Sequence, residues 1–340
     1  MSAATQSPAP FDAVAFARGL MDIDSTTGKE AAVGRKLAAD LRALGWRVQE
    51  QPVSGERFNI LATVGEPKVT FSTHFDCVPP YFPSRVEGDK LMGRGACDAK
   101  GILAAQVAAA ERLRAQGETR VALLFVVGEE RGSDGAKRAN TLPNQSKFLI
   151  NGEPTDLRLG TATRGGVRFR LHADGRAAHS GYPELGESAT EKLLDCLEIL
   201  RRAEWPDDPV LGRTHFNIGL LSGGVAPNVI PPHAHAELFF RTVSDADIVR
   251  RRVQELVGAR LRIEETAFVP LVRLHTVGGF EQAVFSYATD VPFLDNWGTP
   301  LLFGPGSIHV AHTDHEFLSI AELHAAIDGN VRIASELLAQ

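Results

Sequence analysis

The first half of the chain alternates stretches of helical apolar spacing with short, nearly continuous apolar runs. Helical spacing occurs in 11–21, 30–44 and 100–116. Extended runs lie between these stretches at 47–51, 58–64, 68–73, 120–127 and 147–151. Such interleaving is typical of a mainly parallel sheet with helices on both faces. We therefore predict an α/β domain built on a mainly parallel mixed sheet flanked by helices.

The pattern changes after Gly165 and Gly166. Residues 167–174 alternate between apolar and polar, as expected of a sheet with one solvent-facing side. The next elements are predicted as helix 188–203, strands 214–221 and 233–242, helix 245–257 and strand 260–266. This β-α-β-β-α-β order is the ferredoxin-like arrangement. We predict one domain from 1–164 and 270–340, closed by a helix at 320–338, and an inserted α+β module at 165–269.

Acidic and histidine residues follow several of the predicted strands. They are His74 and Asp76 after 68–73, Glu129 and Glu130 after 120–127, Glu153 after 147–151, and His312 beyond 299–303, while Asp98 precedes helix 100–116. Taken singly, each has an ordinary interpretation: a surface pair, a solvated turn or a helix cap. Because open α/β sheets bind ligands beyond the carboxyl ends of their strands, we expect these side chains to meet at one edge.

The residue types in this set suit a pair of zinc ions, because zinc accepts both imidazole nitrogen and carboxylate oxygen. Two divalent ions are balanced by one bridging hydroxide and three carboxylates, with two neutral histidines completing the set: Asp98, Glu130, Glu153, His74 and His312.

Two further carboxylates have their own predicted tasks. Asp76 lies two residues from His74 and is expected to hold the second ring nitrogen of that imidazole. Glu129 is left over beside the ligands, where a general base is required.

Seven short motifs, taken together, resemble those of a known enzyme family. They are STHFDCVPP at 72–80, GRGACDAKG at 93–101, GEERG at 128–132, GEP at 152–154, GRAAHS at 175–180, GGVAPNVIP at 223–231 and GPGSI at 304–308. In order and spacing they resemble the dinuclear zinc family of acetylornithine deacetylase, succinyl-diaminopimelate desuccinylase, aminoacylases and glutamate carboxypeptidase. The resemblance covers nearly the whole chain. It implies that the inserted module is a lid and dimerisation domain.

The resemblance also implies a role for each site residue. His74 and Glu153 would bind one metal, Glu130 and His312 the other, and Asp98 both. Spacing alone does not choose among three nearby histidines, and the family context favours His312 over His309 and His315. Gly128 departs from the family, since many relatives carry an acidic residue there.

The remaining implied roles concern catalysis and substrate. Glu129 would be the general base for the water between the two zinc ions, and His179 would reach the substrate carbonyl, commonly from the partner subunit. Asn228, Arg241 and Gly306 are the substrate-binding candidates, with the arginine gripping a carboxylate.

The predicted function is a zinc-dependent amidohydrolase that removes an N-acyl group, above all acetyl, from an amino acid, as acetylornithine deacetylase does. It would hold two Zn²⁺ per chain, which Co²⁺ can replace. A dipeptidase, carboxypeptidase or desuccinylase of the same family is the alternative, because the same amide chemistry serves all of them. A non-catalytic metal-binding homologue is a further alternative, against which the presence of Glu129 argues.

Composition and charge indicate which partners and which cellular location to expect. The 340 residues include 36 Lys and Arg against 42 Asp and Glu, a net charge of −6 without a basic stripe, which argues against nucleic acid. No apolar run is long enough to span a membrane. The 3 cysteines are far apart and fit reduced thiols in cytoplasm, and residues 1–10 are typical of a frayed terminus rather than a signal peptide. We expect a cytoplasmic homodimer acting on a small N-acyl amino acid or dipeptide.

Overall fold

The computed structural model describes residues 11–340, so the expectation for residues 1–10 lies outside the described part. The chain forms two compact units. Unit 1 contains the chain up to Thr161 together with 274–283 and 289–340, and unit 2 contains 162–273 with 284–288. Unit 2 thus takes in a second, short stretch of chain beyond the inserted module predicted at 165–269.

Unit 1 is built on a six-stranded mixed sheet, which confirms the predicted α/β class. Its strands, in spatial order, are β1 (Arg47–Ser54), β2 (Arg57–Thr63), β6 (Val121–Val126), β3 (Val69–His74), β7 (Phe148–Asn151) and β17 (Thr299–Leu302). The four strands from β6 to β17 are parallel, whereas β2 is antiparallel to both of its neighbours, β1 and β6. Every residue of β3 and β6 is buried, as expected of strands covered on both faces.

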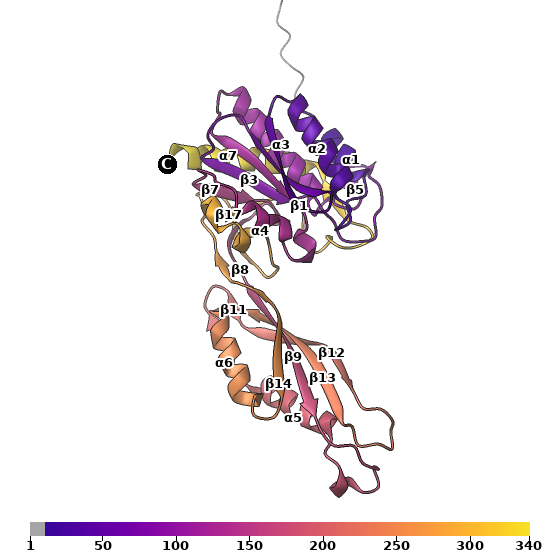
Figure 1. The fold of residues 1–340 in the computed structure, drawn as a ribbon. Helices are drawn as coiled ribbons and strands as arrows, with labels where there is room; N and C mark the ends of the chain where they lie inside the picture. Colours follow the sequence, from indigo (N-terminus) through magenta and orange to yellow (C-terminus); the bar gives the residue numbers. More distant parts are fainter. Residues whose placement is uncertain (1–10) are drawn as a thin grey trace, which may run out of the picture. The chain divides into compact units, whose positions relative to one another are not determined.

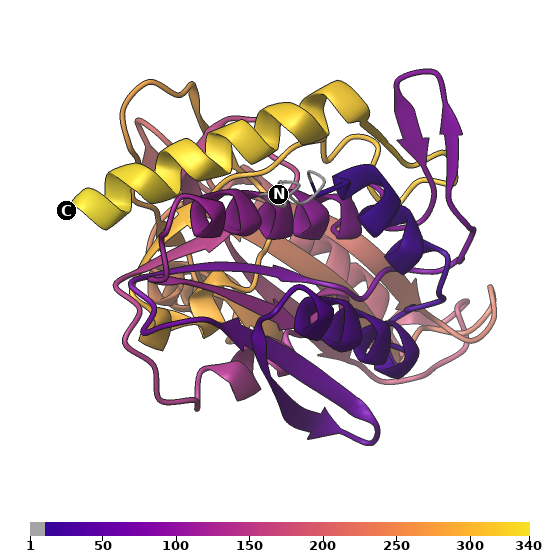
Figure 2. The ribbon, with the colours of Figure 1, turned by 90° about the horizontal axis from the view of Figure 1, so that it is seen from above.

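Helices cover both faces of this sheet. One face packs against α1 (Ala13–Met21), α2 (Ala31–Ala43), α3 (Lys100–Ala115) and α7 (Ile320–Ala339). Figure 2 shows α7 lying alongside α3 above the sheet. The other face packs against α4 (Asp134–Ala139), η3 (Val291–Phe293) and η4 (Asp295–Trp297). Adjacent residues of β6 point to the two faces, since Leu123 joins the first core and Leu124 the second.

Unit 2 carries a four-stranded antiparallel sheet in the order β12-β13-β9-β14. Its elements follow the chain as β9 (Gly165–Asp174), α5 (Ala189–Arg202), β12 (His215–Gly223), β13 (His233–Thr242), α6 (Ala246–Val257) and β14 (Arg262–Val269). This is the predicted β-α-β-β-α-β order, with both helices packed on one face (Figure 1). Strand β12 is an edge strand.

Short elements complete the structure. A three-stranded sheet contains β4 (Arg85–Glu87), β5 (Lys90–Met92) and β18 (Phe317–Ser319), and another contains β8 (Leu159–Thr163), β15 (Val272–Arg273) and β16 (Gln282–Phe285). A small hairpin pairs β10 (Asp207–Asp208) with β11 (Gly212–Arg213), and two short turns of helix are η1 (Glu129–Arg131) and η2 (Pro183–Leu185). Within residues 11–340, no helix has the length and apolarity needed to cross a membrane.

Candidate metal centre

The predicted ligands of unit 1 lie in loops at the carboxyl ends of neighbouring parallel strands. His74 is the last residue of β3, Glu130 lies in η1 directly after β6, and Glu153 follows β7. Asp98 directly precedes the N-cap residue of α3, and His312 lies between β17 and β18. Because β6, β3 and β7 are adjacent, their loops meet at one edge of the sheet.

The structure brings these five residues together in two overlapping groups. His74, Asp98 and Glu153 form one group and Asp98, Glu130 and His312 the other, with potential ligand atoms in each group all within 4.8 Å of one another. The two oxygens of Asp98 face different histidines: Oδ1 lies 2.9 Å from His74 Nε2, and Oδ2 lies 3.2 Å from His312 Nε2. Asp98 therefore has the geometry of a carboxylate that bridges two cations.

The chemistry of the cluster fits cations. Burial raises the pKa of Glu153 well above its usual value, and its Oε1 atom is buried without a hydrogen-bond partner among residues 11–340. Hydrogen bonds to Asp98 and Glu130 raise the pKa of His312 to about 10. Without a metal, the protonated imidazole is thus the positive charge that these two carboxylates bind. Carboxylates and imidazoles in such number are the donor set that zinc accepts.

Asp76 holds two parts of the site at once. It is fully buried, and its Oδ1 atom lies 3.3 Å from Nδ1 of His74. The same carboxylate accepts hydrogen bonds from the backbone N–H groups of Glu129 at 3.1 Å and Glu130 at 3.3 Å, and from the Thr27 hydroxyl at 2.8 Å. Asp76 thus contacts the imidazole and also anchors the turn that carries both glutamates.

The two adjacent glutamates have different surroundings. Glu130 Oε1 lies 3.0 Å from His312 Nε2, whereas Glu129 belongs to neither ligand group. Burial and the negative charge of Glu153 raise the pKa of Glu129 well above its usual value. A carboxylate with raised proton affinity beside a ligand cluster is suited to accept and return a proton.

The structure separates the three histidines that spacing left open. His312 reaches the cluster, His309 is exposed, and His315 pairs with the neighbouring Asp314 at 3.2 Å. His312 has a positive φ of 65°, an uncommon backbone conformation for a residue with a Cβ atom.

Gly128, the departure from the family pattern, has a structural cause. Its φ is +75°, and a Cβ atom there would lie 1.9 Å from Asp134 Oδ1 and 2.5 Å from Arg57 Nη2. Asp134 pairs with Arg57 at 2.7 Å, and Arg57 also pairs with the buried Glu30 at 2.8 Å. The carboxylate of Asp134 therefore occupies the space that an acidic side chain at position 128 would enter.

Sequence reasoning missed Asp290, a buried carboxyl group of unit 1. It is 1% exposed, and its carboxyl group lies near the Ser133 hydroxyl. Burial raises its pKa to about 7. Its charge also acts on Glu129 and Glu153, raising the pKa of each. Asp290 begins a short irregular segment without a motif, so the sequence offers no signal for it.

In unit 2, His179 and Asn228 lie close together. His179 forms an isolated β-bridge with Val229, and the N–H of Ser180 donates to the carbonyl oxygen of Asn228 at 3.0 Å. Both predicted residues are exposed.

Arg241 lies at the other end of the same sheet. Along the β13-β9 pairing, Arg241 is opposite Gly166 and His233 is opposite Asp174, the last residue of β9 before the His179 loop. The eight steps along the strand from His233 to Arg241 correspond to about 26 Å at roughly 3.3 Å per residue. Within a single copy of unit 2, Arg241 and His179 therefore lie far apart.

Arg241 has a cationic neighbour that the sequence did not indicate. Partial burial and the positive charge of Arg164 lower the pKa of Arg241. Arg241 lies over the Phe239 ring, 4.4 Å from its centroid, and Arg164 Nε is buried without a hydrogen-bond partner in the described part of the chain. Among residues 11–340, neither guanidinium forms an ion pair with a carboxylate, so this pair of charges is suited to an anion.

Gly306, the last substrate-binding candidate, lies in a tight turn with φ +79°. Its N–H donates to Glu322 Oε2 at 3.2 Å, and its carbonyl oxygen accepts from the N–H of Asp156 at 2.8 Å. A Cβ atom at this position would lie 2.6 Å from Cys97 Sγ. The backbone groups of Gly306 are thus already used within unit 1.

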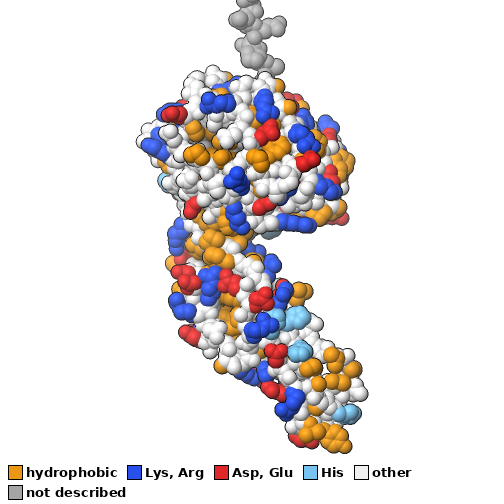
Figure 3. Space-filling model, in the orientation of Figure 1, with side chains coloured by type: hydrophobic (Ala, Val, Ile, Leu, Met, Phe, Trp, Pro, Cys, Tyr) orange, Lys and Arg blue, Asp and Glu red, His pale blue; other side chains and the backbone are white. Residues whose placement is uncertain are grey.

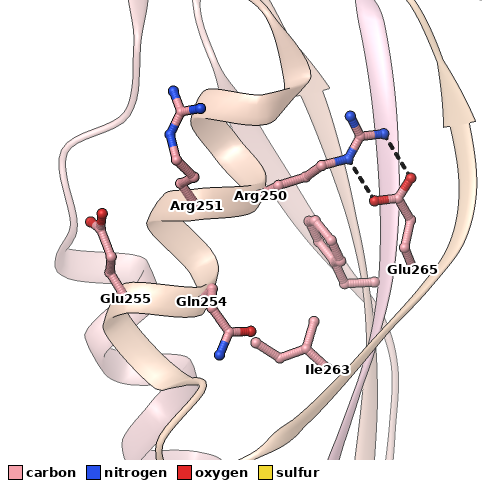
Figure 4. Close-up of a pocket in the computed structure, with 7 residues that line it drawn as sticks. Arg250, Arg251, Gln254, Glu255, Ile263 and Glu265 are labelled. Atoms are coloured by element: carbon pink, nitrogen blue, oxygen red, sulfur yellow. Dashed lines mark hydrogen bonds and ion pairs between the residues drawn. The ribbon is translucent and has the colours of Figure 1, made fainter.

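A pocket in unit 2 is lined by none of the predicted site residues. It has a volume of about 470 Å³ and lies between α6 and β14 (Figure 4). Two of its charged lining residues neutralise each other, because Arg250 forms two hydrogen bonds with Glu265, at 2.7 and 2.8 Å. On the face of unit 1 drawn in Figure 3, side chains of both charges are interspersed.

Comparisons with known proteins place this geometry in a family. The model of the peptidase family M20/M25/M40 matches residues 70–336. A probable carboxypeptidase of Aspergillus terreus is 39% identical, over 95% of this chain and 85% of that relative. The chain therefore belongs to the M20/M25/M40 family of peptidases.

Solved structures agree in fold. A tripeptidase of Staphylococcus aureus superposes with a TM-score of 0.81 at 19% identity, covering 96% of this chain and 98% of that one. A dinuclear metal-binding M20 peptidase of Bacillus subtilis superposes with a TM-score of 0.69 at 15% identity, covering 95% and 97%. At these identities the likeness concerns the fold.

Proposed function

We propose that this peptidase-family hydrolase uses two metal ions, zinc above all, to cleave the amide bond that joins an acyl or peptidyl group to a carboxyl-terminal amino acid. The observation that carries the proposal is the double group of ligands sharing Asp98, with Glu129 beside it and outside both groups. A single metal site needs no shared carboxylate, and a purely binding protein needs no unliganded glutamate beside one.

The five clustered residues would hold the metals: His74 and Glu153 one ion, Glu130 and His312 the other, and Asp98 both. When bound, the two ions supply Lewis acidity, which polarises the scissile carbonyl and lowers the pKa of water.

The remaining catalytic work belongs to the side chains. Glu129 takes a proton from the attacking water and passes it to the departing amine, a task suited to a carboxyl group of raised pKa. Asp76 keeps the His74 ring and the backbone of Glu129 in place during both transfers. His179 donates a hydrogen bond to the oxyanion that develops on the carbonyl.

Arg241, with Arg164 beside it, is proposed to bind the free carboxylate of the substrate, because two guanidinium groups that have no carboxylate partner within residues 11–340 suit an anion. This requirement is met both by peptides cleaved at the carboxyl terminus and by N-acyl amino acids. The name of the fungal relative favours the peptide substrates. N-acetyl amino acids, including acetylornithine, are the second substrate class to test.

The active protein is proposed to be a homodimer, with His179 acting in the partner's site. Support comes from the separation of Arg241 and His179 along the β13-β9 pairing, which is too long for one small substrate to contact both in the same chain. The edge strand β12 carries exposed Leu220 and Leu221, and Val225 beyond it is 73% exposed. An apolar edge strand is a natural surface for pairing with a second copy.

The test is release of free amino acid from a matched panel, assayed with zinc-loaded protein. The panel contains dipeptides, N-acetyl amino acids and the carboxyl-terminal amides of both. Cleavage of the free acids, with little cleavage of the amides, is the expected result. Two tightly bound metals without any turnover would instead support a non-catalytic homologue.

A further inference from the structure

Glu316 is a fully buried carboxylate that grips the loop carrying Asp98. Its Oε1 atom accepts hydrogen bonds from three backbone N–H groups, those of Gly95 at 3.1 Å, Cys97 at 3.0 Å and Asp98 at 3.0 Å. Its Oε2 atom accepts from Arg94 Nη1 at 2.6 Å. Three N–H groups converging on one oxygen determine the path of this loop up to Asp98 itself.

The start of the same loop is also held. The N–H of Gly93 donates to the carbonyl oxygen of Glu316 at 3.1 Å, and Arg94, which is 1% exposed, donates through Nε to the carbonyl oxygen of Pro80 at 3.1 Å. Directly after Glu316, β18 pairs with β5, so that Phe317 is opposite Met92. The backbone at Glu316 and directly after it is therefore tied to the start of the loop.

We propose that Glu316 is a positioning residue that sets Asp98 to face both metal ions. The inference rests on the two-metal centre proposed above. Asp98 must direct its two oxygens toward His74 and His312 at once, so a small shift of its backbone would misplace at least one of them. Glu316 also lies four residues after His312, and it thereby links the loop of Asp98 to the segment that carries a ligand of the second metal.

Glu316 has two physical tasks, which variants can separate. It accepts the three N–H groups, and it neutralises the buried charge of Arg94. Glu316→Asp keeps the charge but withdraws the oxygen by one methylene. Arg94→Met combined with Glu316→Gln removes both charges while an amide oxygen remains to accept the N–H groups. Positioning through the backbone predicts that the first variant loses metal affinity and the second keeps it.

The experiment measures Zn²⁺ affinity of the metal-free proteins by competition with a chelating dye, and the visible absorption of the Co²⁺-loaded proteins. We expect Glu316→Asp to weaken Zn²⁺ binding about 10- to 100-fold, as loss of supporting hydrogen bonds around metal ligands does, and to change the Co²⁺ spectrum. The double variant should stay close to wild type in both. Leu37→Ala, on the buried face of α2, is the control for a loss of stability alone.

Wild-type affinity in Glu316→Asp would overturn the inference, as would an equal loss of affinity in Leu37→Ala. If Glu316→Asp does not fold, the double variant decides, because affinity retained there supports the inference and affinity lost there contradicts it. A wild-type protein that binds fewer than two metals refutes the metal centre itself. That result is distinct from a wild-type protein that binds two metals with an affinity that does not depend on Glu316, which would refute only the role of Glu316.

Discussion

The carboxylate of Asp76 accepts a hydrogen bond from the backbone N–H of Glu129 at 3.1 Å. The Glu129 side chain thus extends from a backbone that is fixed from the same point as the imidazole of His74. A general base needs this kind of fixed placement, because proton transfer depends on a short distance to the reacting water. Adjacent glutamates can then differ in task although they share one turn.

Glu129→Gln is expected to lower kcat by at least about 10⁴-fold with both metals still bound, because the amide cannot accept a proton and general acid-base catalysis contributes about 10²- to 10⁴-fold per transfer. Glu130→Gln should lower metal content as well, since this residue faces His312. Steady-state kinetics and metal analysis on the same preparations make the comparison. A Glu129→Gln enzyme that keeps more than about a tenth of wild-type kcat would remove this residue from the mechanism.

Two metals per chain are expected in zinc-supplied protein, and His74→Ala and His312→Ala should each lower the occupancy of a different site. Elemental analysis of the three proteins, prepared without chelator, measures this. Chelated enzyme should regain activity with Zn²⁺ or Co²⁺ but poorly with Mg²⁺, which prefers oxygen ligands. One ion per wild-type chain would contradict the dinuclear centre.

Arg241→Ala is expected to raise KM about 10- to 100-fold for substrates with a free carboxylate, because hydrogen bonds to charged groups are worth about 1.5 to 3 kcal/mol. The same substrates as methyl esters or amides should change much less. Arg168→Ala is a suitable control, since Arg168 also lies against Phe239 but is exposed. Equal losses on acids and amides would mean that Arg241 supports structure instead.

His179→Ala and Glu129→Gln are each expected to be inactive alone, yet mixing them should restore part of the activity. In the mixed dimer, one site receives an intact Glu129 from its own chain and an intact His179 from the other. Subunit exchange must be verified with differently tagged chains. Exchange without any recovery would place His179 in the site of its own chain or outside the site altogether.

Asp290 predicts a pH dependence of stability in the metal-free protein. Its folded pKa of about 7 lies above the ordinary value near 3.9, so the folded state binds the extra proton and the free energy of unfolding falls as pH rises from about 4 to 7. A difference of about 3 pKa values corresponds to at most roughly 4 kcal/mol. Asp290→Asn should remove this loss, stabilising the protein at pH 8 but not at pH 4. Urea unfolding of chelator-treated proteins at both pH values measures it, and an equal effect at the two values would contradict the burial of an ionisable Asp290.

The sequence predicted the buried elements more fully than the supports of the site. Strand β6 is an uninterrupted apolar run, and His74, Glu130 and Glu153 lie at or just beyond the carboxyl ends of β3, β6 and β7. The hairpin of β4 and β5 was not predicted, because these strands are short and β4 is entirely exposed. Asp290 and the hydrogen bonds of Glu316 lie in irregular segments, whose long-range contacts leave no periodicity in the sequence.

The Asp134 carboxylate fills the space next to Gly128, and this limits which substitutions position 128 can accept. An acidic residue at position 128 would collide here with the carboxylate of Asp134. The two positions can therefore accept that residue only together, with Asp134 shortened or replaced in the same step. A design that altered position 128 alone would therefore damage this protein.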